Sequence, residues 1–520
     1  MKRSLALKQL EDVDQWDIIV IGGGATGLGV AVDAASRGYR TLLLEQADFA
    51  KGTSSRSTKL VHGGVRYLEQ GNVKLVLEAL HERGIFLKNA SHLARKQAFI
   101  IPVYSFWEKV KYYAGLKLYD WMAGQQRIGR STLLSKKKVV RQMPGVRQDH
   151  LQGGILYYDG QFDDARMAVS LAQTCQDHGG TTLNYFTVNK LLKNASGKIT
   201  GVVAADNETG ASYQLQGRVV VNATGVFVDE IHEMDSGAEE HSIQPSQGVH
   251  LVLPPRFLKT TDFALMIPKT DDGRVLFLVP WHNHLLMGTT DTPLEEHTLE
   301  PRALEKEVAF ILRNAGKYLK QAPQRADVLS VYAGLRPLAL PSDKGGQSSK
   351  DISRHHSLEV SKSGLVTITG GKWTTYRKMG EDTVDKAIVV GDLPPKNSAT
   401  AQLKIHGWEQ KSINSWDVYG TDREKIDALV TAHPEWAQKL DADWPQTYAE
   451  VVWAVEEEMA RKLEDVLCRR FRILFLDAGA ALRMAPQVAR IMRERLNKDE
   501  AWEKSELAAF AGLAQEYRLN

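Results

Sequence analysis

Three glycines of this chain stand where a backbone can come close to an anion. Gly22, Gly24 and Gly27 form the pattern GxGxxG between residues 17–21, a short apolar β-rich run, and residues 25–37, which have helical spacing. The first glycine of such a pattern permits a tight turn, the second lets the backbone reach a pyrophosphate, and the third lets helix pack on strand. The helix N-terminus then faces the anion. The sequence therefore predicts a dinucleotide at this loop.

Four further features bear on which dinucleotide binds here, and the first fits either candidate. Glu45 ends a second apolar run about 20 residues after the loop, where a carboxylate can bind ribose hydroxyls of either a flavin or a nicotinamide dinucleotide. Residues 53–59 are dense in hydroxyl groups suited to phosphate and ribityl oxygens, and residues 221–225 end a strand in a turn of small residues. A second GxGxxG pattern is absent from the sequence, so a dedicated NAD(P) domain is not expected. FAD is the predicted cofactor.

The elements that must position these residues indicate an α/β fold. Residues 17–45 form a predicted βαβ unit, and later strands are predicted at 219–221, 275–279 and 365–369. Because strand and helix patterns return along the chain, we expect the cofactor-binding domain to be discontinuous. A helical pattern dominates from about residue 402 onward.

The 520 residues exceed what one core usually holds, about 250 to 300 residues. We predict an N-terminal arm over residues 1–15 and an FAD-binding domain over 16–395 that is discontinuous with a β-sheet substrate-binding domain. A helical C-terminal domain is predicted over 400–520, with long helices at 448–471 and 480–496.

Composition excludes several classes of protein. Hydrophobic residues make up 43% and charged residues 25%, as in folded globular chains. The net charge of +3 is too balanced for nucleic acid as the main partner. Cys175 and Cys468 show no metal-ligand or disulfide spacing, so no metal site is expected. A cytoplasmic location is expected, because the start does not resemble a signal peptide and no run of about 18 apolar residues occurs.

Several strings are more specific than the glycine loop: residues 53–55, 59–68, 163–166, 222–225, 288–291, 334–338 and 370–377. On these strings the sequence resembles the aerobic, quinone-linked, FAD-dependent glycerol-3-phosphate dehydrogenases. The resemblance implies a glutathione-reductase-like FAD-binding Rossmann domain, a β-sheet substrate-binding domain and a helical C-terminal domain. It also implies oxidation of sn-glycerol 3-phosphate to dihydroxyacetone phosphate, with hydride passing to flavin N5 and electrons then to a quinone.

The resemblance places cations at the substrate, as a dianionic phosphate requires, because arginine matches phosphate oxygens with a planar fork and lysine adds a mobile charge. For any single cation, the alternative is that it forms an ordinary ion pair within the protein and does not bind substrate. Oxidation of an alcohol also needs a base for the hydroxyl proton, and His250 is the first choice, with Arg336 as the rival that stabilises an alkoxide. The expected substrate-binding residues are Arg66, Tyr67, Thr290, Arg336, Arg354 and Lys372.

The expected cofactor-binding residues extend from the glycine loop to the segments named above. They are Gly22, Gly24, Ala25, Thr26, Gly27, Glu45, Thr53, Ser54, Ser55, Lys59, Leu60, His62, Gly63, Gly64, Val188, Ala223, Thr224, Gly225, Gly371, Lys372 and Thr374.

Three other functions compete with this hypothesis. An oxidase of the same fold would pass electrons to oxygen. An amino-acid or hydroxy-acid oxidoreductase usually needs one arginine for a carboxylate, and four candidate cations fit that poorly. A flavoprotein without catalysis would use its C-terminal helices to bind a partner.

Residues 106–122 interleave aromatic residues with lysines and predict a basic amphipathic helix suited to a bilayer interface. An ordinary surface helix whose aromatic residues pack inward is the alternative. With a quinone acceptor, the protein is expected to lie peripherally on the inner face of the cell membrane. The sequence is also compatible with a homodimer.

Overall fold

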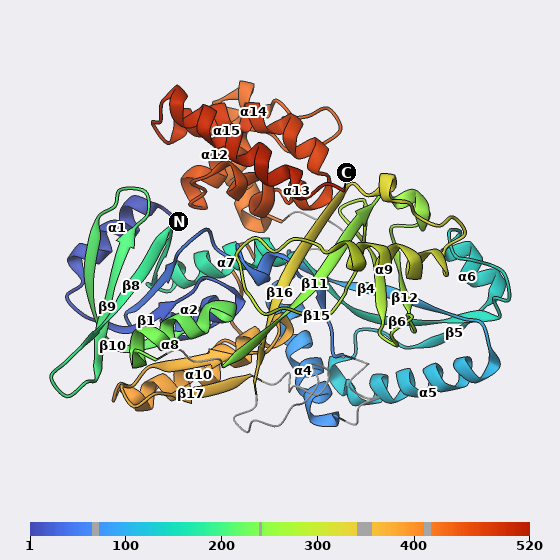
Figure 1. Cartoon of the computed structure of the whole chain (residues 1–520), viewed down its shortest axis with the longest axis horizontal. Coiled ribbons are helices and arrows are strands. Elements are labelled where there is room, and N and C mark those ends of the chain that lie inside the picture. Colours follow the sequence, from blue (N-terminus) through green and yellow to red (C-terminus); the bar gives the residue numbers. More distant parts are fainter. Residues whose placement is uncertain (65–71, 239–241, 341–355, 410–417, 520) are drawn as a thin grey trace.

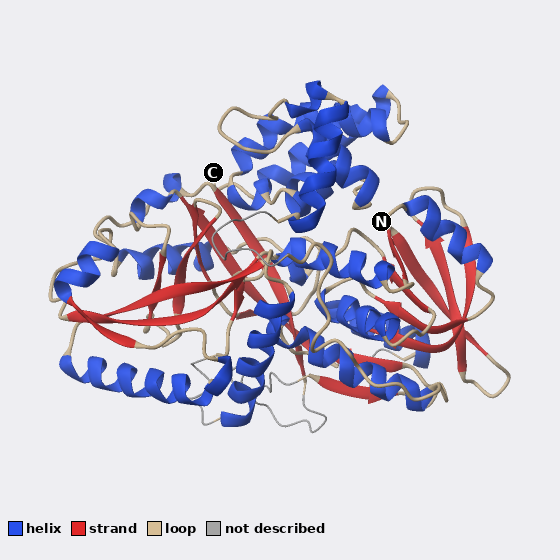
Figure 2. Ribbon diagram, turned by 180° about the vertical axis from the view of Figure 1, so that it is seen from behind, coloured by secondary structure: helices blue, strands red, loops and turns tan. Residues whose placement is uncertain are grey.

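Two β-sheets lie beside each other, and a group of C-terminal helices packs across them (Figure 1). The computed structural model describes residues 1–64, 72–238, 242–340, 356–409 and 418–519. Figure 2 shows the same arrangement from behind, with helices around both sheets.

The first sheet has a parallel centre in which β1 pairs with both β2 and β10. Its strand order is β17-β18-β10-β1-β2-β7, and β8 and β9 extend β10 as an antiparallel meander. The bounds are β1 (Trp16–Ile21), β2 (Thr41–Glu45), β7 (Thr181–Asn184), β8 (Phe186–Lys193), β9 (Ile199–Asp206), β10 (Ser212–Asn222), β17 (Ser357–Val360) and β18 (Val366–Thr369).

Helices cover this sheet because its central strands are apolar on both faces. Ile18, Ile19 and Val20 are consecutive and wholly buried, as expected of a parallel strand between two helical layers. Helix α2 packs against both α7 and α10. The helices around this sheet are α1 (Arg3–Asp12), α2 (Ala25–Ser36), α7 (Asp164–Asp177), α8 (Val228–Ser236) and α10 (Tyr376–Val390).

The second sheet has the order β15-β11-β14-β13-β12-β4-β6-β3, with β16 paired to β11 and β5 to β6. Its strands are β3 (Leu60–Val61), β4 (Ala94–Val103), β5 (Thr132–Ser135), β6 (Gly153–Phe162), β11 (Ile243–Leu253), β12 (Phe263–Ile267), β13 (Leu276–Trp281), β14 (His284–Gly288), β15 (Thr292–Pro293) and β16 (Ser330–Ala339). Its helices are α4 (Val73–Asn89), α5 (Phe106–Met122), α6 (Lys136–Gln142) and α9 (Glu305–Gly316).

The two sheets alternate along the chain. Strands of the first sheet come from residues 16–45, 181–222 and 357–369, and strands of the second come from 60–162 and 243–339. The predicted strands near Val219, Val275 and Leu365 are confirmed as β10, β13 and β18. This interleaving brings residues far apart in sequence to the seam between the sheets.

The C-terminal helices differ from the prediction at one point. The expected helix over 448–471 is wrong, because α12 ends at Glu457 and a π-helical turn follows at Asp465–Arg470. Between them Met459 has a positive φ of 54°, and the Asp465 carboxylate accepts hydrogen bonds from the backbone N–H groups of Arg461 and Lys462. The helices are α11 (Arg423–Ala432), α12 (Tyr448–Glu457), α13 (Ile473–Leu476), α14 (Ala478–Arg495) and α15 (Glu500–Gln515).

Candidate functional site

A cavity of about 450 Å³ lies at the seam between the two sheets. One end is lined by the glycine loop after β1 and by the ends of β2 and β10. The other end is lined by residues of β11 and β16 in the second sheet and by the turn after β18. The cavity therefore connects the predicted nucleotide loop to the predicted substrate residues.

The glycine loop leaves its backbone open to the cavity. A Cβ on Gly22, whose φ is 109°, would lie 2.6 Å from the carbonyl oxygen of Ala223, and one on Gly27 would lie 1.9 Å from the Gly22 carbonyl. Gly24 is the N-cap of α2 and supplies no side chain, so no N-cap side chain lies between the first turn of this helix and the cavity. Such a terminus fits a pyrophosphate.

Two side chains hold this end of the cavity in shape. The Glu45 carboxylate lines the cavity and accepts hydrogen bonds from the backbone N–H groups of Gly23 (2.6 Å) and Ala47 (2.9 Å). Burial raises the pKa of Glu45 above its ordinary value, although both hydrogen bonds oppose that change. The Ser54 hydroxyl accepts a hydrogen bond from the backbone N–H of Ala25 at 2.8 Å. These contacts fit the ribose and phosphate of a dinucleotide.

The substrate end depends on the register of β11 and β16. His250 lies opposite Tyr332, Gly248 opposite Gly334, and Ser246 opposite Arg336. Alternate residues of a strand share a face, so two glycines separate His250 from Arg336 on the same face. Gly248, Gly334, His250 and Arg336 all line the cavity. The Arg336 guanidinium packs over Gly248 and Arg56 packs over Gly334, so neither position has room for a side chain.

His250 is held as a neutral imidazole. Its ring stacks on Tyr332 with centroids 4.9 Å apart, and Nε2 lies 2.9 Å from the Thr58 hydroxyl. Nδ1 is buried and has no hydrogen-bond partner among the described residues. Burial and the nearby cations Lys59 and Arg336 lower the pKa of His250 well below its ordinary value. A neutral imidazole can accept a proton.

Arg336 presents a fixed guanidinium to the cavity. Nη1 donates to Asp291 at 3.1 Å, and Nη2 donates to the Thr290 carbonyl at 3.1 Å and to the Thr289 hydroxyl at 3.2 Å. Its side chain is 25% exposed, which leaves part of it accessible to a ligand. Lys372 lines the same end of the cavity.

Comparison with known proteins agrees with this geometry. The FAD dependent oxidoreductase family model matches residues 17–377, and the model for the C-terminal domain of alpha-glycerophosphate oxidase matches residues 366–503. The mitochondrial glycerol-3-phosphate dehydrogenases of Schizosaccharomyces pombe and Homo sapiens are each 38% identical to this chain. They cover 96% and 97% of it, over 87% and 74% of their own lengths. The chain belongs to the FAD-dependent glycerol-3-phosphate dehydrogenase family.

Solved structures extend the comparison to the whole fold. The glycerol-3-phosphate dehydrogenase from Bacillus halodurans complexed with FAD has a TM-score of 0.80 and 28% identity, and covers 99% of this chain and 97% of its own. The L-alpha-glycerophosphate oxidase from Mycoplasma pneumoniae with FAD bound shares the fold at 15% identity, with a TM-score of 0.58, over 76% of this chain and 99% of its own.

Most of the predicted site residues line the cavity. They are Gly22, Gly24, Ala25, Thr26, Glu45, Thr53, Ser54, Leu60, His62, Val188, Ala223, Thr224, Gly225, His250, Arg336, Gly371, Lys372 and Thr374. Arg66, Tyr67 and Arg354 lie outside the described residues.

Six predicted residues do not line the cavity, and two of them have a clear structural partner instead. The wholly buried ammonium of Lys59 bonds both carboxylate oxygens of Asp164, at 2.8 and 2.7 Å, so it is not directed at a phosphate. The Thr290 hydroxyl donates to Glu307 at 2.8 Å and not toward the substrate end. The other four are Gly27, Ser55, Gly63 and Gly64, of which Gly27 acts by packing helix on strand.

Several residues that line the cavity are not among the predicted site residues, and four of them carry charge or leave space at the site. Lys51 and Arg56 are cations of the segment after β2, and Gly248 and Gly334 lie opposite each other on β11 and β16. Arg56 lies within the predicted hydroxyl-rich segment, so the sequence could have identified it as a candidate site residue. Nothing in the sequence gives the strand register that places the two glycines opposite each other.

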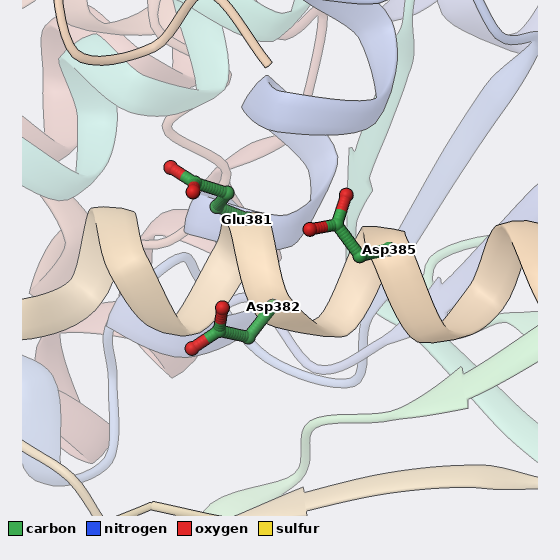
Figure 3. A group of neighbouring side chains, drawn as sticks. All are labelled: Glu381, Asp382 and Asp385. Atoms are coloured by element: carbon green, nitrogen blue, oxygen red, sulfur yellow. The ribbon is translucent and has the colours of Figure 1, made fainter. Parts of the chain in front are cut away.

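Three carboxylates on α10 form a cluster with the spacing of metal ligands (Figure 3). Each already has a cation: Asp385 pairs with Arg37 at 2.6 Å, Asp382 with Lys378 at 2.7 Å, and Glu381 with Lys378 at 3.0 Å. These ion pairs account for the cluster.

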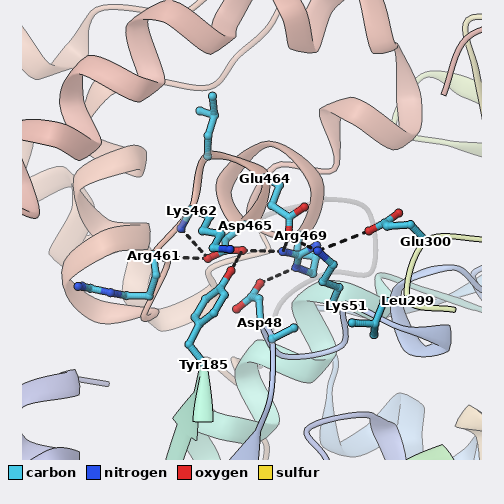
Figure 4. Close-up of polar contacts among 12 residues, drawn as sticks. Asp48, Lys51, Tyr185, Leu299, Glu300, Arg461, Lys462, Glu464, Asp465 and Arg469 are labelled. Carbon is cyan, nitrogen blue, oxygen red and sulfur yellow. Dashed lines mark hydrogen bonds and ion pairs between the residues drawn. The ribbon is translucent and has the colours of Figure 1, made fainter. Parts of the chain in front are cut away.

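Behind the glycine-loop wall, charged residues of the C-terminal helices meet the loop after β2 (Figure 4). The buried carboxylate of Asp48 accepts hydrogen bonds from Arg469 at 2.5 Å and from Arg470 at 2.7 and 3.0 Å. Burial would raise the pKa of Asp48, but the two guanidinium groups lower it to about 2. Lys51, which lines the cavity, pairs with Glu464 at 2.6 Å. The C-terminal helices therefore support one wall of the cavity.

Proposed function

We propose that this chain oxidises sn-glycerol 3-phosphate to dihydroxyacetone phosphate with bound FAD. One observation carries the proposal: a single cavity joins the N-terminus of α2 at one end to Arg336, Lys372 and a neutral His250 at the other. The names of the relatives, glycerol-3-phosphate dehydrogenases at 38% identity, support the same substrate.

The residues of the chain divide the work of alcohol oxidation. The guanidinium of Arg336 and the ammonium of Lys372 hold the dianionic phosphate. His250, neutral and fixed by Thr58 and Tyr332, takes the proton of the secondary hydroxyl at a ring nitrogen. FAD, when bound, supplies the acceptor for the hydride that leaves the substrate carbon. The low pKa of His250 keeps its proton-accepting form available at neutral pH.

The side chains around the nucleotide end would hold FAD. The first turn of α2 would hold the pyrophosphate, Glu45 would bind ribose hydroxyls, and Thr53 and Ser54 would offer hydroxyl groups to the oxygens of FAD. Anaerobic titration of the purified holoenzyme with glycerol 3-phosphate tests the function. The oxidised flavin spectrum should bleach. An oxidised spectrum that persists, with turnover of an amino acid in its place, would contradict the proposal.

The electron acceptor is part of the proposal. We expect a quinone, and the rival acceptor is oxygen, as in an oxidase of the same fold. Peroxide yield during turnover, with and without a soluble quinone analogue, separates the two. Reduction of the quinone with little peroxide supports the proposal, and stoichiometric peroxide in the presence of the quinone contradicts it.

A quinone acceptor implies contact with a bilayer, and α5 supplies a suitable surface. This helix lies along the edge of the molecule (Figures 1 and 2). Trp107 and Trp121 are 78% and 76% exposed, and Phe106 is 62% exposed. Lysines accompany them along the helix, as in helices that lie in the membrane interface. Among the described residues, none of the helices has the length and apolar character needed to span a membrane.

The proposed location is the cytoplasm, with peripheral attachment to the inner face of the cell membrane through α5. Sedimentation with vesicles of phosphatidylcholine and anionic phosphatidylglycerol tests this attachment. Wild-type protein should pellet with the vesicles, and the double variant Trp107→Ser, Trp121→Ser should remain in the supernatant with its flavin reduction unchanged. Equal pelleting of both proteins would contradict the role of α5. A homodimer stays a prediction, which native mass measurement checks.

A further inference from the structure

A buried carboxylate lies behind the wall of the cavity that carries Arg336. Glu307, in the first turn of α9, is 2% exposed. Its Oε1 accepts hydrogen bonds from the hydroxyls of Thr290 at 2.8 Å and Thr292 at 2.6 Å. Its Oε2 accepts from the side-chain amide of Gln247 at 2.7 Å and from the backbone N–H of Leu304 at 3.0 Å. Four uncharged donors thus hold one buried carboxylate.

This carboxylate is linked to Arg336 through one residue. Thr290, which donates to Glu307, offers its carbonyl to Arg336 Nη2 at 3.1 Å. Its hydroxyl also accepts a hydrogen bond from the backbone N–H of Val249 at 3.0 Å, which ties the turn to β11. The next residue, Asp291, accepts from Arg336 Nη1 at 3.1 Å. Fixing Thr290 therefore fixes two of the acceptors that orient the guanidinium.

Gly248 provides the space that the guanidinium occupies. A Cβ at this position would lie 2.4 Å from Arg336 Nη2 and 2.6 Å from the Thr289 hydroxyl. Any side chain here would displace Arg336 or the 289–291 turn. The guanidinium therefore lies over Gly248, the glycine that separates Arg336 from His250 along the sheet face.

We infer that Glu307 and Gly248 are positioning residues for Arg336 in the binding of the phosphorylated substrate. Glu307 holds the turn that supplies the acceptors of Arg336, and Gly248 leaves room for the guanidinium between that turn and the cavity. The inference rests on the proposed function, because it takes Arg336 as a group that binds the phosphate. Glu307 itself does not line the cavity, so it acts only through its neighbours.

If Glu307 had a purely structural role, its substitution would change stability and leave substrate binding unchanged. Glu307 also caps the start of α9, because it accepts a hydrogen bond from the backbone N–H of the N-cap residue Leu304, and loss of a cap lowers stability alone. The chain offers a matched control in Glu450, which completes the capping box of α12, is 7% exposed and accepts from the backbone N–H of Thr447 at 2.8 Å. Glu307→Gln and Glu450→Gln therefore make the same substitution near the N-termini of two helices, and Glu450→Gln also removes an ion pair with Arg423 at 3.4 Å.

The test uses holoenzymes loaded with FAD. For wild type, Glu307→Gln and Glu450→Gln, we would measure kcat and KM for glycerol 3-phosphate, and the Tm. The Kd of the product dihydroxyacetone phosphate would come from its perturbation of the flavin absorbance. In Glu307→Gln only the amide oxygen can accept, so either the two threonine hydroxyls or Gln247 and Leu304 lose their acceptor, and the hold on the 289–291 turn should weaken. We expect KM and the product Kd to rise about 5- to 20-fold, with kcat changed less than about threefold.

The control and a second variant keep the inference falsifiable. Glu450→Gln should lower the Tm and leave KM and the product Kd unchanged. Gly248→Ala leaves Glu307 itself unchanged and crowds the guanidinium directly, so its KM should rise at least as much as that of Glu307→Gln. An unchanged KM and product Kd in both Glu307→Gln and Gly248→Ala, with bleaching of the wild-type flavin by glycerol 3-phosphate, would overturn the inference. Absence of bleaching in the wild type would contradict the proposed function instead.

Discussion

The interface of the C-terminal helices and the substrate end of the cavity both contain buried charges, and they use them differently. At the interface, Asp48 meets two arginines, Arg469 and Arg470, and all three side chains are at most 2% exposed. Behind the cavity wall, the buried Glu307 accepts from neutral donors among the described residues, and Arg336 stays 25% exposed. Charges that neutralise each other serve stability, whereas a cation on a cavity wall serves a ligand.

This difference separates two kinds of defect. Removing one partner of a buried ion pair leaves an uncompensated charge and costs stability. Removing a cation from the cavity wall costs affinity for an anion, because the wall is accessible to solvent when the ligand is absent. Variants at the interface should therefore lose stability, and variants at the cavity wall should lose affinity for the substrate.

The largest effect on the free energy of unfolding is expected at the interface. Asp48→Asn removes the charge that two buried arginines share, and we expect a loss of about 3 to 5 kcal/mol. Urea unfolding of the holoenzyme measures it. Arg256→Gln breaks the exposed pair with Asp327 and serves as the control, with an expected loss below about 1 kcal/mol. An equal loss of unfolding free energy in the two variants would show that the buried ion pair contributes no more to stability than the exposed one.

The next effect concerns chemistry at the cavity. His250→Ala removes the proposed base, and we expect the rate of flavin reduction to fall about 10²- to 10⁴-fold. Because the pKa of His250 lies well below 6.5, its neutral form is present above that value, and the wild-type rate should stay level from pH 8 down to pH 6.5. Stopped-flow reduction across this range checks both points. Unchanged reduction kinetics in the variant would exclude His250 as the base.

A smaller effect is expected for substrate binding. Arg336→Ala and Lys372→Ala should each weaken the binding of glycerol 3-phosphate by about 1.5 to 3 kcal/mol through loss of a charged hydrogen bond. The unfolding free energy should change much less than in Asp48→Asn. The KM for glycerol 3-phosphate and the Kd of dihydroxyacetone phosphate measure the loss. A variant with normal KM would show that its cation serves the cofactor or the fold.

The smallest effect concerns the dependence of stability on pH. His406 lies between Asp177 and Asp422, at 2.6 and 2.8 Å. Burial alone would lower the pKa of His406, but the two carboxylates raise it to about 9. Because the folded pKa is raised, the contribution is fully present below the unfolded value of 6.5 and is lost as pH rises through about 9.

We expect this loss to be about 1 to 2 kcal/mol after screening by solvent, since Asp177 is half exposed. Urea unfolding at pH 6 and pH 9.5 measures it for wild type and His406→Gln. The variant should show a flatter profile over this range. Profiles that coincide would assign the pH dependence to other groups.

The sequence by itself determined the nucleotide end of the site. Glu45, Ser54 and the loop from Gly22 onward lie within about 35 residues of one another, and a βαβ unit places them by local rules of strand, turn and helix. The resemblance then identified Arg336, His250 and Lys372, which do line the cavity. The interruption of the helix after Glu457 was beyond local propensity, because the side-chain amide of the distant Asn184 donates to the Met459 carbonyl at 2.9 Å within the break.

Only the tertiary structure decided how the substrate end is built. The register between β11 and β16 places Gly248 opposite Gly334, and α9 brings Glu307 to Thr290 from another part of the chain. The same structure turned Lys59 away from the cavity, because Asp164 offers its buried ammonium two oxygens. Pairing between strands and burial of charge depend on contacts across long sequence separations, which no single segment of the sequence specifies.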